Sequence, residues 1–262
     1  MAYDTILFSV DGGIARLTLN RPEKLNSFNA QMHGEVRHAL DGLIGGEARV
    51  LVLTGAGRGF CAGQDLGDRA VAAGSAGVDL GESIEKHYNP LVLALEALPM
   101  PVIAAVNGVA AGAGANIALA CDLVIAARSA NFIQAFAKLG LLPDSGGTWI
   151  LPRLVGHARA LGLTLLGDKL PAEQAAAWGM IWQCVADADL MPTVDGLAQA
   201  LAAAPTRGLA RTKAAIRGSW RHTLAEQLDI ERDDQRELGR SADYAEGVAA
   251  FTEKRTPRFV GR

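Results

Sequence analysis

The chain has 262 residues, half of them hydrophobic, which is long enough to bury a substantial core. With 25 basic and 28 acidic residues its net charge is −3, whereas a nucleic-acid surface needs clustered excess positive charge. The cysteines Cys61, Cys121 and Cys184 are an odd, scattered set that fits neither a disulfide framework nor a metal site. We therefore expect no metal, no nucleic-acid partner and a reduced, cytoplasmic compartment.

Two features bear on membranes and secretion. The first residues show no basic leader before an apolar run, so we expect no signal peptide. Residues 102–127 are apolar and long enough to span a bilayer. They contain Asn107, Asn116 and Asp122 and many Gly and Ala residues, which favours a buried strand–turn–helix–strand over a membrane span.

The first half of the chain alternates apolar runs with helical patterns. Two runs around an Asp-Gly turn signal predict a β-hairpin, at 6–10 and 14–19. Apolar periodicity predicts buried strands at 49–54, 102–106 and 122–127, and helices at 29–44, 83–98 and 112–120. The Gly- and Ala-rich residues 67–82 predict a mobile loop. Strands that alternate with helices indicate an α/β fold with buried sheets.

The second half of the chain reads as helical. Helices are predicted at 157–167, 171–178, 190–204, 205–219, 223–239 and 241–254. The last three are charged on one face and apolar on the other, so they would pack on their own core or on a neighbouring subunit. We therefore divide the chain into an α/β core at 1–204 and a C-terminal helical subdomain at 205–262.

Two glycine-rich segments follow buried strands. The first, residues 55–66, lacks both the phosphate-loop ending and the dinucleotide fingerprint. Its glycines alone favour a tight structural turn. The second, residues 107–116, opens a helix, and the free N–H groups of a helix N-terminus can hold an oxyanion. Close helix packing through Gly and Ala explains the second segment equally well, and both interpretations can hold together.

A third segment, residues 138–148, places the carboxylate of Asp144 after an apolar run and before Gly146 and Gly147. Asp144 could cap the helix that is expected to start near Gly146. It could also act as a general base in a partly desolvated pocket. The segment by itself leaves both interpretations open.

In their order, spacing and flanking strands, the three segments resemble the crotonase, or enoyl-CoA hydratase/isomerase, superfamily. The resemblance covers essentially the whole chain, from residue 19 through the C-terminal helices. It implies an α/β crotonase (ClpP-like) spiral core of repeated ββα units with a C-terminal helical oligomerisation subdomain. It further implies a homotrimer or dimer of trimers, and an enzyme whose acyl-CoA substrate carries the coenzyme A, so that no separate cofactor is needed.

The resemblance also implies roles for individual residues. The main-chain N–H groups of Gln64 and Ala113 would form an oxyanion hole for the thioester carbonyl, and Asp144 would transfer protons. Coenzyme A would rest near one group of residues: Lys24, Leu25, Ala62, Asp65 and Leu66. Phe251 and Lys254, often supplied in the family by a neighbouring subunit, would assist. The candidates for the acyl pocket are His87, Tyr88, Asn116 and Phe136.

Departures from the hydratase pattern indicate the reaction. Hydratases use two glutamates, at positions that match Asn116 and Phe136, and neither residue here is a carboxylate. Asp144 holds a third position that several isomerases of the family use, and one carboxylate suffices to move a proton between two carbons. Within the family, the stretches 54–66, 106–115, 142–149 and 240–244 resemble isomerases of bacterial phenylacetate catabolism. That resemblance implies conversion of a ring 1,2-epoxide thioester into an oxepin thioester.

Alternative functions remain within the resemblance. A general Δ3,Δ2-enoyl-CoA isomerase would use the same groups, and a hydratase would be handicapped with one carboxylate. Aryl-CoA dehalogenases use the Asp144 position as a nucleophile, but they pair it with a Trp where this chain has Phe136. A non-catalytic, RNA-binding crotonase would favour a lysine-rich helix, and none is evident.

Overall fold

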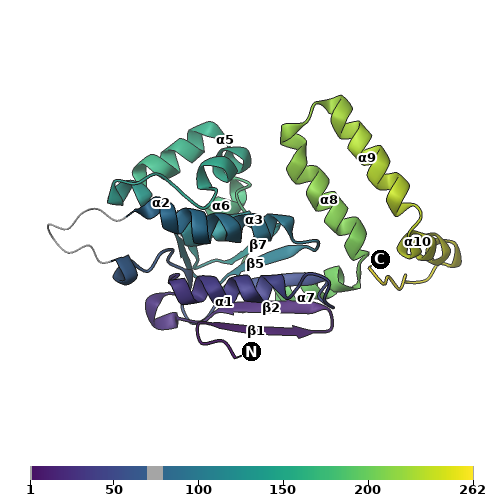
Figure 1. Cartoon of the computed structure of the whole chain (residues 1–262), viewed down its shortest axis with the longest axis horizontal. Coiled ribbons are helices and arrows are strands. Elements are labelled where there is room, and N and C mark those ends of the chain that lie inside the picture. Colours follow the sequence, from purple (N-terminus) through teal and green to yellow (C-terminus); the bar gives the residue numbers. More distant parts are fainter. Residues whose placement is uncertain (1, 70–78, 262) are drawn as a thin grey trace.

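The computed structural model describes residues 2–69 and 79–261 (Figure 1). The strands are β1 (Ile6–Asp11), β2 (Ile14–Leu19), β3 (Val50–Gly55), β4 (Gly59–Cys61), β5 (Val102–Val106), β6 (Val109–Ala111), β7 (Leu123–Ala127), β8 (Asn131–Ile133), β9 (Lys169–Pro171) and β10 (Gln183–Val185). The helices are α1 (Ala30–Asp41), α2 (Leu80–Ser83), α3 (Asn89–Ala97), α4 (Ala113–Ala120), α5 (Gly147–Leu166), α6 (Ala172–Ala177), α7 (Leu190–Ala203), α8 (Thr206–Gly218), α9 (Leu224–Leu238) and α10 (Ala242–Glu253). Short helical turns complete the chain: η1 (Pro22–Lys24), η2 (Leu66–Arg69), η3 (Ile84–Tyr88), η4 (Ala135–Leu139), η5 (Asp187–Asp189) and η6 (Ser219–Arg221).

The strands form two sheets that are built by a repeated unit. The larger sheet has the order β1-β2-β3-β5-β7-β10, and the smaller has the order β4-β6-β8-β9. β3, β5 and β7 pair in parallel in the larger sheet, and each is followed in sequence by a strand of the smaller sheet. A helix then returns the chain, so the ββα unit repeats and the chain winds as a spiral. The predicted α/β fold is confirmed.

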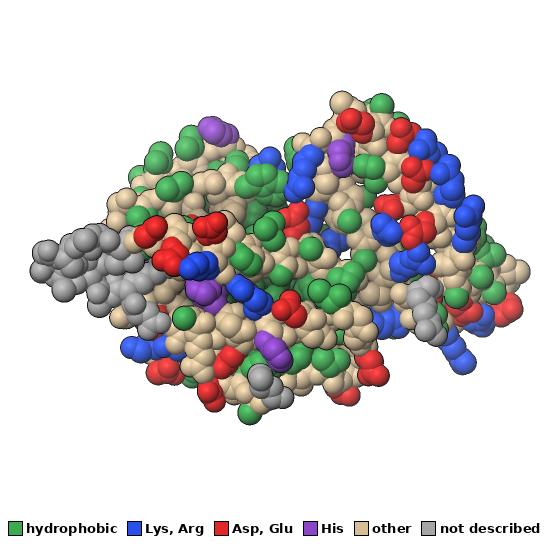
Figure 2. All heavy atoms as spheres, viewed as in Figure 1, with side chains coloured by type: hydrophobic (Ala, Val, Ile, Leu, Met, Phe, Trp, Pro, Cys, Tyr) green, Lys and Arg blue, Asp and Glu red, His purple; other side chains and the backbone are tan. Residues whose placement is uncertain are grey.

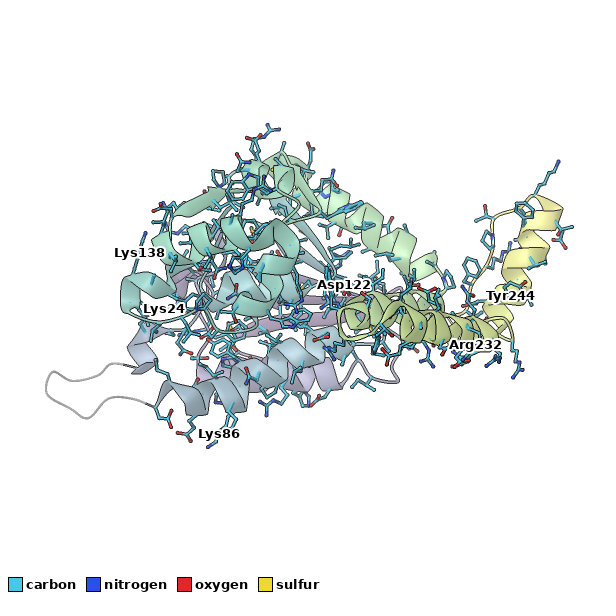
Figure 3. All side chains as sticks on the ribbon, turned by 90° about the horizontal axis from the view of Figure 1, so that it is seen from above. Lys24, Lys86, Asp122, Lys138, Arg232 and Tyr244 are labelled. Carbon is cyan, nitrogen blue, oxygen red and sulfur yellow. The ribbon has the colours of Figure 1, made fainter. Side chains whose placement is uncertain are left out.

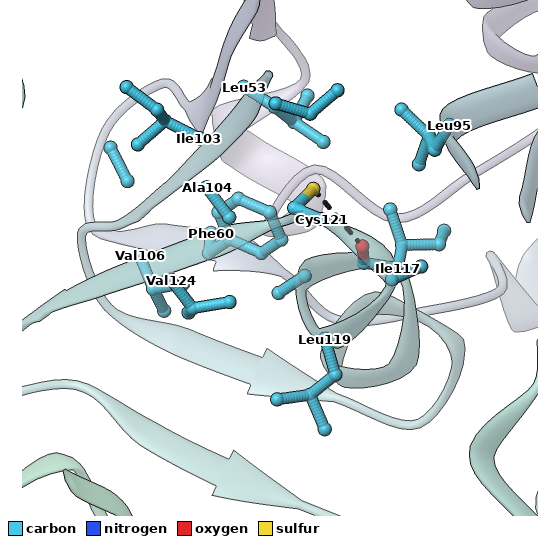
Figure 4. Close-up of a cluster of buried hydrophobic side chains, with 14 of the residues drawn as sticks. Leu53, Phe60, Leu95, Ile103, Ala104, Val106, Ile117, Leu119, Cys121 and Val124 are labelled. Carbon is cyan, nitrogen blue, oxygen red and sulfur yellow. Dashed lines mark hydrogen bonds between the residues drawn. The ribbon is translucent and has the colours of Figure 1, made fainter. Parts of the chain in front are cut away.

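The core lies around α4, whose residues are all buried. Phe60, Ile103 and Ile117 pack together there (Figure 4), and each is 0–1% exposed. The apolar stretch 102–127 is β5, β6, α4 and β7, as the interpretation of a buried strand–turn–helix–strand expected. In the described part of the chain no helix has the length and apolar character needed to cross a bilayer.

The last three helices extend away from the core (Figure 1), and α8 is tied to the core by a half-buried charge cluster. The Lys213 ammonium lies 2.9 Å from Asp122 Oδ2, and the Arg217 guanidinium lies 2.7 Å from Asp122 Oδ1. Burial lowers the pKa of Lys213, against the attraction of Asp122. α9 buries no residue within the chain, and Figure 2 shows basic side chains along its outer edge.

Several element bounds differ from the predictions. The helix predicted at 29–44 ends at Asp41 with Gly42 as its C-cap, and the helix predicted at 83–98 is divided among α2, the π-helical turn η3 and α3. The helix predicted at 157–167 is the second half of α5, which kinks at Gly156 (φ 76°). Residues 70–78, the middle of the predicted mobile loop, lie outside the described residues.

Candidate active site

The site is built at one edge of the smaller sheet. β4 pairs in parallel with β6, and β6 pairs in parallel with β8, so the carboxyl ends of the three strands meet at the same edge. The segments that follow these ends are residues 62–66, 112–116 and 134–139. Ligands of open parallel sheets bind outside the carboxyl ends of the strands. The fold therefore brings the two predicted glycine-rich segments to one place.

Gly63 makes the close approach between these two segments possible. Its φ is +89°, and a Cβ there would lie 2.9 Å from the Ala111 carbonyl oxygen and 3.3 Å from the Ala113 nitrogen. A side chain at this position would be strained and would collide with the opposing backbone. Because Gly63 lies against the start of α4, its neighbour Gln64 is held beside Ala113.

Among the residues that the structure describes, no main-chain carbonyl accepts from the N–H groups of Gln64 and Ala113. Phe28 bridges to Gln64 in parallel: its N–H donates to the Gly63 carbonyl (2.7 Å), and its carbonyl accepts from the Asp65 N–H (2.9 Å). In that pattern the polar groups of Gln64 point away from Phe28. Ala113 is the first residue of α4 and has no intrahelical acceptor. Within the described residues neither N–H has a main-chain acceptor, and two such donors beside a helix N-terminus suit an oxyanion.

Asp144 is joined to α4 one helical turn after Ala113. Asn116, three residues after Ala113 and so about 4.5 Å further along α4, donates from Nδ2 to the Asp144 main-chain carbonyl over 2.8 Å. The Asp144 side chain is half-buried, and its Oδ1 accepts from Ser145 Oγ over 2.9 Å. The N-cap of α5 is Gly146 and no side chain caps that helix. The interpretation of Asp144 as a helix cap is therefore wrong.

Two acyl-pocket candidates border the donors. Tyr88 is 1% exposed, and its hydroxyl donates to Gln64 Oε1 over 3.0 Å. Phe136 is 7% exposed, and a Cβ on Gly112 would lie 3.7 Å from its ring. Tyr88 therefore contacts the side chain of Gln64, and Phe136 lies beside Gly112, the residue before Ala113.

The other two candidates are placed differently. His87 is half-buried and stacks on His33, with ring centroids 4.9 Å apart, while His33 meets the edge of Tyr88 at 4.5 Å. The His33 ring therefore contacts the side chains of both His87 and Tyr88. Asn116 is fully buried, and its amide contacts protein groups through both of its polar atoms.

The predicted coenzyme A segment forms a continuous stretch of surface beside the site. The Leu25 carbonyl accepts from the Ala62 N–H over 2.9 Å, which joins the two predicted stretches. Leu25 has a left-handed backbone (φ 48°), and Lys24 before it is exposed. Leu66 is 61% exposed. Lys24 and Leu66 therefore have side chains that face solvent, as a ligand-binding rim requires.

Asp65 has a different position from its neighbours. It is 8% exposed, lies 2.9 Å from the Arg21 guanidinium and accepts from the Gly67 N–H over 2.9 Å. Burial alone would raise the pKa of Asp65, but the hydrogen bonds from Arg21 and Gly67 and the nearby positive charge lower it below its usual range. The Asp65 carboxylate is therefore occupied by the protein and holds the Gly-rich segment in place.

Phe251 and Lys254 lie far from this site within one chain. Phe251 is 87% exposed on α10, and Lys254 is the left-handed C-cap of that helix (φ 55°). Figure 3 shows Tyr244 of α10 and Lys24 at opposite ends of the molecule. Phe251 and Lys254 could therefore reach a coenzyme A site only on another subunit.

Thiol and metal chemistry have little basis in the described residues. The Cys61 and Cys121 thiols are fully buried, and burial raises the pKa of each to about 12, so both stay protonated. Cys184 is half-buried, and all three cysteines are free. Where the structure is described, no group of three or more His, Cys, Asp or Glu side chains is placed to hold a metal ion.

Comparison with known proteins identifies the family. Residues 9–262 match the family described as enoyl-CoA hydratase/isomerase. The chain belongs to the enoyl-CoA hydratase/isomerase, or crotonase, family. The solved structure of an enoyl-CoA hydratase from Bacillus anthracis superposes on this family member with a TM-score of 0.93, at 32% identity, covering 99% of this chain and 100% of that one. The predicted crotonase spiral core is thereby confirmed.

Two relatives within the crotonase family carry functional names. The chain is 59% identical to the 1,2-epoxyphenylacetyl-CoA isomerase of Escherichia coli K12, over 98% of both chains. It is 50% identical to a protein of Rhodobacter capsulatus described as a "probable enoyl-CoA hydratase", over 100% of both chains. Full-length coverage shows that these crotonases share the core and the C-terminal helices.

Three residues of this crotonase site were missed by sequence reasoning. Ser145 adjoins Asp144, so its bond to the carboxylate could have been suspected from the sequence. Gln134 donates to Asn116 Oδ1 over 2.8 Å, and Arg21 contacts Asp65, at separations of 18 and 44 residues. No local pattern marks contacts of that range, because they depend on how the strands pair.

Proposed function

We propose that the chain is an isomerase of acyl-CoA thioesters that converts 1,2-epoxyphenylacetyl-CoA into its oxepin isomer in phenylacetate degradation. One observation carries the proposal: the Asn116 amide bonds the Asp144 main chain to α4 one helical turn after Ala113, and among the described residues the N–H groups of Ala113 and Gln64 have no main-chain acceptor. By the family resemblance, Asn116 and Phe136 stand at the positions of the hydratase glutamates. The full-length, 59% identical relative named 1,2-epoxyphenylacetyl-CoA isomerase supports the same substrate.

The proposed mechanism uses the site as built. The thioester carbonyl oxygen accepts from the N–H groups of Gln64 and Ala113, which favours the negative charge of an enolate over the neutral carbonyl. Asp144 removes a proton from the carbon next to the carbonyl, and the electron pair of that C–H bond enters the enolate. The C–C bond shared by the epoxide and the six-membered ring breaks as the ring double bonds rearrange, which gives the seven-membered ring without gain or loss of atoms. The protonated Asp144 returns its proton to a ring carbon. Substrate and product have the same composition, so no co-reactant is consumed.

Coenzyme A binding and assembly belong to the same proposal. The surface of Lys24, Leu25, Ala62 and Leu66 would hold the coenzyme, with Asp65 as its internal support. Phe251 and Lys254 of a neighbouring subunit would complete that surface. We propose a homotrimer or dimer of trimers, with residues 205–262 as the assembling subdomain. The free thiols fit a reduced, cytoplasmic setting.

A general enoyl-CoA isomerase is the second candidate, because the same proton transfer shifts a double bond. A relative from Streptococcus mutans supports it: the chain is 36% identical, over 100% of both chains, to a protein named trans-2-decenoyl-[acyl-carrier-protein] isomerase. Hydration is disfavoured despite the Rhodobacter relative, because activation of water would lack the second carboxylate that Asn116 replaces.

The deciding experiment offers purified protein the epoxide thioester and a 3-enoyl-CoA in parallel, and follows both products by absorbance and mass. We expect the oxepin thioester, of unchanged mass, to form with the higher kcat/KM. Faster conversion of the 3-enoyl-CoA would move the assignment to the general isomerase. A product heavier by one water would show a hydratase.

A further inference from the structure

The turn that carries Asp144 is held by a pair of buried amides. Asn116 is 0% exposed and donates from Nδ2 to the Asp144 carbonyl over 2.8 Å. Gln134 is 3% exposed and donates from Nε2 to Asn116 Oδ1 over 2.8 Å. The same Asp144 carbonyl also accepts from the Gly147 N–H over 2.9 Å. Two donors therefore fix the direction of this carbonyl.

The hydrogen bonds of the two amides all run in one direction, from Gln134 to Asn116 and from Asn116 to Asp144. Because Gln134 donates to the Asn116 oxygen, the Asn116 nitrogen must face Asp144, where it meets an acceptor. A carboxylate at position 116 would place an acceptor against an acceptor, and an aliphatic side chain would provide no donor. Only an amide of this length satisfies both neighbours.

The turn needs this support because its backbone is strained. Ser145 has a φ of 50° and Gly146 a φ of 80°, so two consecutive residues are left-handed before α5 begins. A left-handed Ser is unfavourable and persists only when its surroundings hold it. The bonds to the Asp144 carbonyl, immediately before this pair, supply that constraint.

Gly147 leaves the room that the Asn116 amide occupies. A Cβ on Gly147 would lie 2.4 Å from Asn116 Nδ2 and 2.8 Å from its side-chain carbon. Any residue larger than glycine at 147 would push the amide out of place. Position 147 therefore gives a second way to disturb the Asn116 amide without changing Asn116 itself.

We propose that Asn116, backed by Gln134, is a positioning residue for Asp144. The amide ties the strained turn to α4 and so holds the Asp144 carboxylate in place for proton transfer, without itself touching the substrate. The inference rests on the proposed function of Asp144 in proton transfer. It also explains how Asn116 serves a reaction that needs no carboxylate at this position.

The test uses two substitutions with matched controls. Asn116→Leu removes the donor, and its control Glu35→Gln alters a side chain that bonds to the Thr5 N–H instead. Gly147→Ala displaces the amide, and its control Gly162→Ala adds the same methyl group later in α5, where a Cβ would meet nothing within 4 Å. If Asn116→Leu does not fold, Gly147→Ala still tests the positioning role of Asn116.

We expect kcat for the thioester that the wild type turns over to fall by about 30- to 300-fold in both test variants, as for a misplaced proton-transfer group. The Kd of a non-reacting acyl-CoA should stay within about twofold, because the two N–H donors are untouched. Amide hydrogen exchange in residues 141–149 should become faster in both test variants and stay unchanged in both controls.

The outcomes separate the inference from the function on which it rests. A wild type that converts neither thioester would overturn the proposed function. The rates of amide hydrogen exchange in the variants would still test whether Asn116 holds the turn. An active wild type whose Gly147→Ala variant keeps full kcat and unchanged exchange would overturn the positioning role. Equal losses of kcat in Gly147→Ala and Gly162→Ala would also overturn it, since these would reflect the helix alone.

Discussion

The Tyr88 hydroxyl donates a hydrogen bond to the side-chain oxygen of Gln64 over 3.0 Å. Tyr88 is the last residue of the π-helical turn η3, and π-helical turns occur often at functional sites. The side-chain nitrogen of Gln64 donates to the Asp65 carbonyl over 3.2 Å. The side chain of Gln64 is therefore held at both of its polar atoms, which steadies the residue whose N–H is the proposed oxyanion donor.

Tyr88→Phe should lower kcat modestly. The variant keeps the ring and its packing but loses a bond worth about 1 kcal/mol, so we expect a decrease of about 3- to 10-fold with KM nearly unchanged. Steady-state kinetics with the preferred thioester measure both parameters. Tyr3→Phe is the control, because it removes an exposed hydroxyl bonded to His38. An unchanged kcat would show that the bond does not steady the donor.

Asp144→Asn should abolish turnover and preserve binding. An amide keeps the size of the side chain but accepts no proton, and general acid–base groups contribute about 10²- to 10⁴-fold. Single-turnover assays measure the loss, and calorimetry with a non-reacting acyl-CoA measures the binding. Asp187→Asn, which changes an exposed carboxylate bonded to the Ser129 N–H, is the control. Near-normal turnover of Asp144→Asn would refute the acid–base assignment.

The longer elements could be predicted from the sequence, and the short ones could not. β3, β5 and β7 are apolar runs with clear boundaries, and their positions agree with the predicted strands. β4, β6 and β8 have three residues each, too few for any period to appear. Yet these short strands bring Gln64 and Ala113 together, so the geometry of the site came from the part of the fold with the weakest local signal.

The candidate site shows the same limit at the level of single residues. The sequence alone leaves Asp144 open as a helix cap, whereas the structure has Gly146 as the cap, with its left-handed backbone. Asn116 looked like a pocket residue, whereas its amide faces the Asp144 carbonyl and Gln134. Sequence patterns report residue type and spacing along the chain, but the partner of a buried amide is set by long-range packing.

The Arg21–Asp65 pair should make acid stability depend on one carboxylate. The folded pKa of Asp65 is lowered, so its ionised form contributes stability above its unfolded pKa of about 3.9, and this contribution is lost as the pH falls through the lowered folded value. Asp65→Asn leaves Arg21 unpaired and should cost about 3 kcal/mol at neutral pH. Urea unfolding from about pH 7 down to about pH 2.5 should show the difference in unfolding free energy between the two proteins shrinking below about pH 4. A constant difference at all pH values would contradict the assignment.

The apolar stripe of α10 should be covered in the assembled protein. Tyr244, Val248 and Phe251 are spaced by four and three residues, so they share one face of the helix, and they are 59%, 49% and 87% exposed in the single chain. They line a hollow of about 410 Å³ together with residues of α8 and α9. Covering a large apolar side chain contributes roughly 2 kcal/mol, and closed symmetry repeats that gain at every subunit contact.

For the proposed homotrimer or dimer of trimers, light scattering should give a mass of three or six chains at micromolar concentration. Phe251→Glu should shift the mass toward the monomer, because the contact would then bury a carboxylate without a partner. Ala242→Glu is the control: it adds the same charge to the opposite face of α10, near the N-terminus of that helix, where an acidic residue is favourable. If Phe251 also completes the coenzyme site of a neighbour, KM should rise in Phe251→Glu as the assembly dissociates. A monomeric wild type, or equal masses for both variants, would exclude this face as the interface.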